Sequence, residues 1–327
     1  MTSNTHQART TRPDPRRSPL RELLGNRWLQ LFLLVWAAAA AYIATADRSV
    51  LPTSEQEPLG YFTGIVGASL SVLLLFRLAR GTTPVDHRSG PVLREARGEA
   101  AGLLVWMALV LAVGSALDVR THIAFVGLGE GSRELWSAET VGSTLAWAAY
   151  NFVGLAVAPF LFFRYRLGYD MTSMLLRFPR ARVWAPYFLV IGALGFLPAV
   201  TDDYFSTPAS AHLLTLVLFT VGSFLPVMIT TQALLTPRLA VVTGSWVTGA
   251  VASAIVYAAL NITEAFLAWG TSQQLLLSLA WVMQIAFWGL VKAVTTLRTG
   301  NAWLHIATTH TIHLAEAPAV ATTFDLR

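Results

Sequence analysis

The sequence predicts an all-α protein, a polytopic transmembrane helix bundle of about nine spans (eight to nine), with the N-terminus cytoplasmic. Two observations lead there. First, 54% of the 327 residues are hydrophobic and only 13% are charged, whereas soluble domains are about 25% charged. Second, the charges lie between long apolar stretches and alternate in sign along the chain. Both features are typical of a chain that folds in a bilayer.

The apolar stretches set the expected organisation, because about 20 apolar residues cross a bilayer as a helix. Residues 1–27 are rich in Thr, Arg and Pro and are expected to form a disordered basic cytoplasmic tail. Residues 28–200 are predicted to form N-terminal transmembrane helices, 205–317 a second transmembrane core and 318–327 a C-terminal tail. The expected spans are 28–45, 59–79, 101–118, 143–163, 184–200, 209–235, 244–263, 274–297 and 300–316, the last of which is short and contains three histidines.

Basic residues are enriched in cytoplasmic loops, which predicts the orientation. Arg is in excess in 1–27, 77–99 and 164–182, whereas Asp and Glu are in excess in 46–58, 118–142 and 201–208. Arg238, Lys292 and Arg298 continue the pattern if they lie at cytoplasmic span ends. The net charge of +5 therefore indicates topology and not a nucleic-acid partner. We expect the lipid bilayer, of a bacterial plasma membrane, as the surroundings.

Residues 1–200 contain no phosphate-binding Gly loop, no HExxH and no Gly-x-Ser-x-Gly motif, and they leave any cofactor unknown. The chain has no cysteine, which excludes disulfides and thiolate metal sites. Polar side chains at membrane depth are costly and therefore informative, and most lie in the last third. They are Asn151, His212, Gln232, Asn261, Glu264, Gln284, Lys292, His305, His310 and His313.

Three segments of this last third carry a resemblance. They are VMITTQALLTPRL (227–239), VTGSWVTGAVASAIVYAALN (242–261) and GLVKAVTTLRTGNAWLHIATTH (289–310). In this order and at similar spacing, they resemble the E-E-x-x-x-R, F-x-x-x-H and G-L-x-x-G to H-x-x-x-N segments of the CAAX prenyl protease and bacteriocin-processing (CPBP) family of intramembrane endopeptidases. The resemblance covers about a third of the chain and implies a membrane-embedded site in which a glutamate activates water while histidines and an asparagine position it.

The chain departs from this pattern at nearly every catalytic position. Val227 and Met228 stand in place of the glutamates, and neither side chain can accept a proton. Gln232 replaces the arginine. Tyr257 and Asn261 replace the phenylalanine and histidine of the second motif, and in the third motif His310 is kept while Leu314 replaces the asparagine.

These substitutions favour a pseudoprotease that binds a hydrophobic or membrane-embedded partner, such as a membrane protein or a lipidated peptide, through Asn261 and His310. The alternatives are an endopeptidase with altered catalytic residues, a transporter, and Asn261 and His310 serving only as interhelical hydrogen-bond partners. Residue types alone would also allow His310, His313 and Glu264 to bind a metal ion. The expected depth of Glu264 argues against that site.

The resemblance requires Met228, Asn261 and His310 to converge on one site. Convergence predicts that Leu239–Ser245 form a turn and not a helix, so that Asn261 is not carried too deep. Pro226 is expected to kink its helix and leave a carbonyl free for a partner in the cavity. Lys292 is expected to snorkel or pair near a span end, and His305 to lie at the membrane interface.

Overall fold

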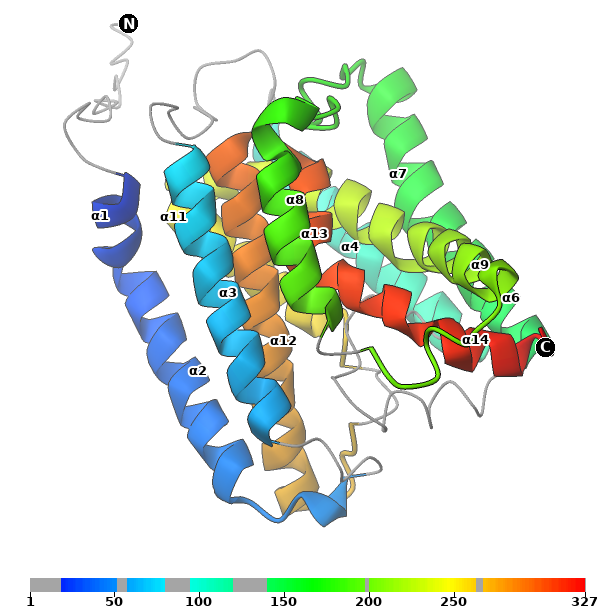
Figure 1. Ribbon diagram of the computed structural model, residues 1–327. Coiled ribbons are helices and arrows are strands. Elements are labelled where there is room, and N and C mark those ends of the chain that lie inside the picture. Colours follow the sequence, from blue (N-terminus) through cyan, green and yellow to red (C-terminus); the bar gives the residue numbers. More distant parts are fainter. Residues whose placement is uncertain are drawn as a thin grey trace, which may run out of the picture.

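The computed structural model (Figure 1) describes residues 19–51, 58–79, 95–119, 140–197, 200–262 and 267–326. Within these ranges every regular element is a helix, which confirms the all-α class. The longer elements are α1 (Pro19–Leu24), α2 (Arg27–Thr45), α3 (Pro58–Leu78), α4 (Ala96–Ala116), α6 (Val141–Asn151), η2 (Phe152–Val157), α7 (Ala158–Leu161), η3 (Phe162–Arg166), α8 (Ala181–Phe196), α9 (Ala209–Phe219), η5 (Thr220–Phe224), η6 (Val227–Leu235), α10 (Thr236–Thr243), α11 (Trp246–Ala259), α12 (Ser272–Thr299), η7 (Ala302–His305), α13 (Ile306–Thr309), η8 (His310–Glu316) and α14 (Ala317–Thr323).

Five helices of the described chain are long and apolar enough to cross a membrane, as in a membrane protein: Arg27–Thr45, Ala96–Ala116, Val141–Arg166, Ala209–Thr243 and Ser272–Thr299. Three shorter apolar helices are Ile65–Leu78, Trp184–Phe196 and Trp246–Ala259. All of these fall on the first eight predicted spans. The ninth, 300–316, is instead broken into η7, α13 and η8. The count of nine spans and the cytoplasmic N-terminus stay predictions.

Local signals in the sequence explain where several helices begin and end. The side chain of Asn26 accepts hydrogen bonds from the backbone N–H groups of residues 28 and 29, so α2 begins at Arg27. Thr271 and Gln274 form a reciprocal capping box at the start of α12. Gly244 and Gly300 have φ of 69° and 66°, a conformation that glycine adopts without strain, and they end α10 and α12.

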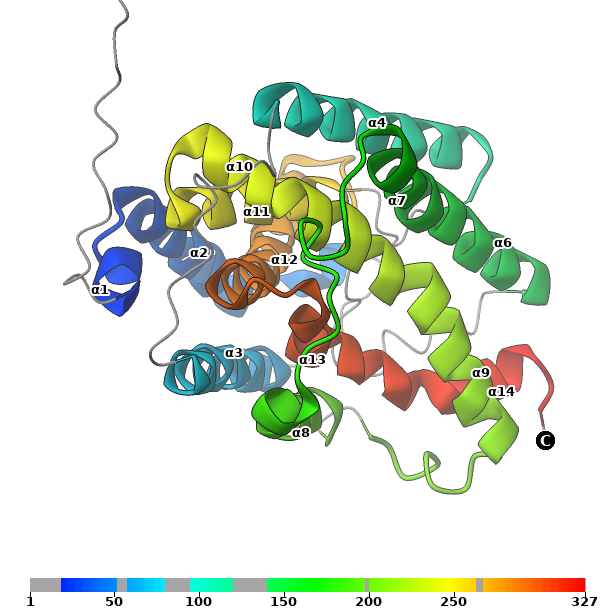
Figure 2. The same ribbon diagram turned by 90° about the horizontal axis from the view of Figure 1, so that it is seen from above.

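Helix α12 lies at the centre of the bundle and packs against α2, α3, α11 and the segment η7–α13 (Figure 2). Helix α11 packs against both α12 and α10. The C-terminal helix α14 packs along α9, where Val320 joins a buried cluster with Trp147 and Phe219. Residues 317–323, most of which belong to the predicted C-terminal tail, are thus helical and packed. Of the predicted N-terminal tail, residues 1–18 lie outside the described residues, and Pro19–Leu24 form α1.

The expected turn at Leu239–Ser245 is wrong for most of its length. Helix α10 continues to Thr243, and the chain reverses only at Gly244 and Ser245. The helices can turn this tightly because Gly249 of α11 lies directly against the backbone of Ala240, where a Cβ atom would collide with the N and Cα atoms. Helix α11 then ends at Ala259, about 21 Å along its axis.

The carbonyl expected from Pro226 is bonded to a neighbouring span and is not left free for a partner in a cavity. Proline has no N–H, so the Gly222 carbonyl four residues earlier lacks its α-helical donor. Asn151 Nδ2 of the neighbouring span donates to this oxygen at 3.1 Å. Thr230 Oγ1 donates in turn to the Leu155 carbonyl. Both carbonyls lie in π-helical segments, η5 and η2, and the reciprocal bonds lock the two spans together in register.

The three basic residues that continued the charge alternation beyond residue 208 are not in loops. Arg238, Lys292 and Arg298 are all buried. The guanidinium of Arg298 donates to the Ala79 carbonyl at 2.5 Å, and the other two have internal contacts described below. The predicted orientation therefore depends on the charges before residue 209.

Candidate functional site

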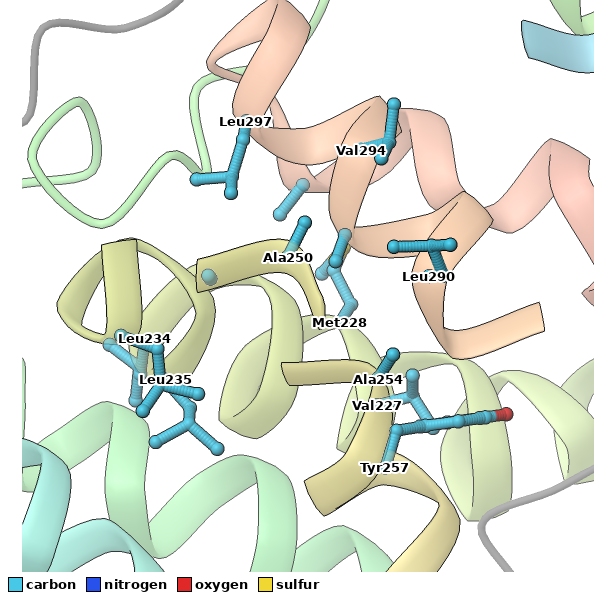
Figure 3. Close-up of a cluster of buried hydrophobic side chains, with 14 of the residues drawn as sticks. Val227, Met228, Leu234, Leu235, Ala250, Ala254, Tyr257, Leu290, Val294 and Leu297 are labelled. Carbon is cyan, nitrogen blue, oxygen red and sulfur yellow. The ribbon is translucent and has the colours of Figure 1, made fainter. Parts of the chain in front are cut away.

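The first motif segment lies on η6 and the start of α10, and all of it except Ile229 is buried. Val227 and Met228 belong to the main apolar cluster, and Figure 3 shows them among Ala254, Tyr257 and Leu290 of α11 and α12. The position that the resemblance assigns to a water-activating carboxylate is thus an apolar contact between helices.

Gln232, four residues after Met228, is also fully buried and bonded. Its Nε2 donates to Thr231 Oγ1 at 3.2 Å, and its Oε1 accepts from Thr296 Oγ1 of α12 at 3.2 Å. Gln232 therefore holds η6 against α12.

The second motif segment runs from the end of α10 through α11, and its motif positions Tyr257 and Asn261 lie at and just beyond the C-terminal end of α11. Asn261 is completely buried, and its Nδ2 donates to the backbone carbonyl of Tyr257 at 2.5 Å. Its Oδ1 has no hydrogen-bond partner. The ring of Tyr257 covers Gly289 so closely that a Cβ atom there would lie 2.8 Å from Tyr257 Cδ1. Gly289 is therefore required for the contact between α11 and α12.

The third motif segment begins in α12 and continues after Gly300 through the short helices η7 and α13 to His310, the first residue of η8. His310 is 1% exposed, and neither of its ring nitrogens has a hydrogen-bond partner. Its ring lies 4.9 Å from the ring of Phe224 and 4.9 Å from the ring of His305. Leu314, at the family's asparagine position, is half-buried and cannot provide an amide.

The structure places two residues that sequence reasoning set aside next to His310. His305, expected at the interface, is fully buried, and so is Lys292, expected near a span end. Lys292 Nζ donates to Thr308 Oγ1 at 3.4 Å, and Thr308 Oγ1 donates to the His305 carbonyl at 2.6 Å. The ring of His305 in turn lies 4.9 Å from the ring of His310. We call Lys292, His305, Thr308 and His310 the polar cluster.

The polar cluster meets the other motif positions through Tyr257. Lys292 Nζ lies 5.9 Å from the centre of the Tyr257 ring. The same residue packs with Val227 and Met228 and accepts the bond from Asn261. Tyr257 thus adjoins Val227, Asn261 and Lys292, and the convergence of Met228, Asn261 and His310 on one site stays a prediction.

The hydrogen bonds fix part of the chemistry of the polar cluster. The Nδ1 atom of His305 lies 2.6 Å from the Ala302 carbonyl, which only accepts, so Nδ1 carries the proton and Nε2 of the neutral ring is an acceptor. That Nε2 has no partner. Lys292 supplies a donor, and His310 supplies one donor and one acceptor. The described residues contain no group of three His, Asp or Glu side chains placed to hold a metal ion. Glu264 lies outside the described residues.

A second buried polar group, which sequence reasoning missed, surrounds Arg238. Its Nε lies 2.6 Å from Glu99 Oε2, and its Nη1 donates to the Leu234 carbonyl at 2.6 Å. The guanidinium carbon lies 4.3 Å from the Phe163 ring centre and 5.0 Å from that of Tyr169. Tyr169, in the segment after η3, donates to Glu99 Oε1 at 2.6 Å. Burial, followed by this hydrogen bond, raises the pKa of Tyr169 to about 12.

Comparisons of the chain with protein-family models, with curated proteins and with solved structures gave no match.

Proposed function

We propose that this chain is an integral membrane protein with a CPBP-like core that binds a hydrophobic, membrane-embedded partner without cleaving it. The proposal includes eight to nine crossings of a bacterial plasma membrane with the N-terminus in the cytoplasm. Its support is the set of long apolar helices and the excess of Arg in the segments 1–27, 77–99 and 164–182.

The observation that carries the proposal is the apolar burial of Val227 and Met228 beside buried polar atoms that lack partners. Peptide hydrolysis by this family's chemistry needs a group that takes a proton from water. The two side chains at that position contact Tyr257 and Leu290 instead (Figure 3). The site has thus lost its water-activating group and kept groups that bind.

The binding groups are Asn261 Oδ1 and the two ring nitrogens of His310, none of which has a hydrogen-bond partner. Leaving such an atom buried and unpaired costs about 1–3 kcal/mol. A ligand that pairs with them recovers this free energy. A peptide group offers both a donor and an acceptor, which favours a lipidated peptide or a membrane-protein segment as the partner.

One observation favours the endopeptidase alternative. Lys292 Nζ donates to Thr308 Oγ1, which donates to the His305 carbonyl, and a neutral amine can accept a proton in place of a carboxylate. That reading predicts that His310→Ala abolishes cleavage of a membrane substrate in cells.

The test of binding uses a farnesylated peptide that carries a photoreactive diazirine, added to the purified protein in lipid nanodiscs. We expect saturable crosslinking to the segments that contain Met228, Tyr257 or His310. Asn261→Phe, which fills the site, should reduce the crosslinking at least tenfold, and the matched apolar exchange Met228→Leu should leave it unchanged. Equal crosslinking of all three proteins, or crosslinks confined to exposed residues of α2 and α4, would contradict the proposal.

A further inference from the structure

The chain between η3 and α8 crosses one end of the helix bundle as an irregular segment with a fixed inner face. Segment 167–180 runs from the end of η3 past the end of α12 to the start of α8 (Figure 2). Its backbone carbonyls at positions 175, 176 and 177 accept hydrogen bonds from Ala302 N–H, Trp303 Nε1 and Asn301 Nδ2 at 2.7–2.9 Å. Met174 and Leu176 are buried in the main apolar cluster. The segment is therefore held against the bundle along its length.

Large apolar side chains are left exposed at both ends of this segment. Tyr165, at the η3 end, is 76% exposed, and Phe178, at the α8 end, is 75% exposed. The η3 end closes the long apolar helix 141–166, and the α8 end precedes the apolar helix 184–196. Aromatic side chains that flank membrane spans lie at the level of the lipid headgroups. Both exposed rings thus lie where a span would meet the membrane surface.

Each exposed ring has arginine close to it in the chain. Arg166 follows Tyr165, and Arg177 and Arg180 flank Phe178. All three arginines are exposed, and within the described residues none of them forms an ion pair with a carboxylate. An anion from outside the protein would complete this positively charged surface.

The acidic side chain of segment 167–180 does not neutralise these arginines. Asp170 is the only acidic residue of the segment. Its Oδ1 accepts hydrogen bonds from the backbone N–H and the hydroxyl of Ser173, both at 2.6 Å. The carboxylate therefore stabilises a local turn.

We propose that the two ends of segment 167–180 bind anionic phospholipids. Arg166, Arg177 and Arg180 bind the headgroup phosphates, because a guanidinium matches phosphate oxygens through two parallel hydrogen bonds. Tyr165 and Phe178 lie where headgroups meet acyl chains. A lipid with net negative charge is preferred over a zwitterionic one, whose cationic group offsets the phosphate.

This inference depends on the chain lying in a bilayer and not on the hydrophobic partner proposed above. It goes beyond that function by naming the lipids that the protein selects. Lipids bound at both ends would also secure segment 167–180 over the residues that follow α12, through the bonds from residues 301–303.

The test is native mass spectrometry of the purified protein in detergent with an equimolar mixture of phosphatidylglycerol and phosphatidylcholine. The ratio of the two lipids retained on the protein measures the preference. We expect the wild-type protein to retain mainly phosphatidylglycerol. The triple variant Arg166→Gln, Arg177→Gln and Arg180→Gln should lower the preference by about tenfold or more, because each arginine near an anionic surface contributes to affinity.

The matched control is a second triple variant with the same change in net charge, Arg27→Gln, Arg77→Gln and Arg97→Gln. These three arginines are exposed and lie outside segment 167–180. The control should keep most of the preference. All six positions are exposed, so both variants should keep the wild-type circular dichroism spectrum.

Two results would overturn the proposal. One is a wild-type protein without a preference, or equal loss of the preference in the two triple variants, which would reduce the effect to overall charge. The other is a soluble glutamate-rich peptide that binds the wild-type protein and excludes both lipids, because the occupant would then be an acidic protein.

Discussion

The buried pair of Arg238 and Glu99 gives the sharpest stability prediction. The two side chains are 0% and 11% exposed and meet at 2.6 Å. Removing one partner of a buried pair leaves an uncompensated charge and costs about 3–5 kcal/mol. Because Glu99 is slightly exposed and Arg238 keeps its contacts with Phe163 and Tyr169, we expect Glu99→Leu to cost about 3 kcal/mol, at the lower end of that range. The double variant Glu99→Leu with Arg238→Met should cost less than Glu99→Leu alone, because no charge is then left buried.

The assay is SDS titration of the purified protein in mixed micelles, followed by tryptophan fluorescence, with the four proteins of the double-mutant cycle measured together. Glu95→Leu is the matched control, because Glu95 is an exposed glutamate four residues earlier, and exposed substitutions change stability by about 0.5 kcal/mol or less. If the double variant is destabilised by the sum of the two single changes, the pair does not interact in the way described.

Three further predictions follow from other contacts. Gly222→Ala should destabilise the protein by about 1–3 kcal/mol, because its Cβ would lie 2.6 Å from the Trp147 ring. A Cβ at Gly67 would have no atom within 4 Å, so Gly67→Ala should be neutral or slightly stabilising in the same SDS titration. The pKa of Tyr169 is about 12 in the folded protein against an ordinary value of 10.0, so its contribution to stability is complete below pH 10 and is lost as the pH rises through 12. Tyr169→Phe should remove this part of the pH dependence of thermal unfolding. An alkaline profile that Tyr169→Phe leaves unchanged would contradict the prediction. The chain has no cysteine, so Thr172→Cys and Asp202→Cys each introduce a single thiol. A membrane-impermeant maleimide added to intact cells should label only position 202, which is predicted to face outward. Labelling of position 172 would show that the predicted orientation is reversed.

Hydropathy predicted the helices well because each span is a local property of the sequence. The first eight expected spans coincide with apolar helices. The missing donor at Pro226 is equally local, but the carbonyl that it leaves bonds to another span and not to a partner in a cavity. The identity of the bonding residue, Asn151 of another span, could not be predicted, because it depends on how distant parts of the chain pack.

The buried basic residues show where sequence reasoning fails. Arg238 and Glu99 are 139 residues apart, and nothing in the local pattern of either residue indicates the other. Lys292 was assigned to a span end because charges usually mark span ends. In the structure α12 continues to Thr299, and the following segment folds back so that Thr308 and His305 lie beside Lys292.

The motif positions were partly predictable. The resemblance predicted that Met228, Asn261 and His310 converge on one site, which stays a prediction, while Val227, Met228 and Tyr257 lie in one buried apolar cluster. The distinction between a spanning helix and an irregular one at residues 300–316 was not predictable from hydropathy, because a buried apolar segment has the same composition in either form. This difference brings His305 and His310 to 4.9 Å between ring centres, where one straight helix would have pointed them apart.

The most direct test of the central claim is the chemical fate of a bound partner. The farnesylated peptide is incubated for a day with the purified protein in nanodiscs at a concentration that saturates binding, and the peptide is then recovered and weighed by mass spectrometry. We predict that the peptide is recovered whole, because Val227 and Met228 cannot activate water. Recovery of a peptide cut at a single bond, at a rate that His310→Ala abolishes, would contradict the claim.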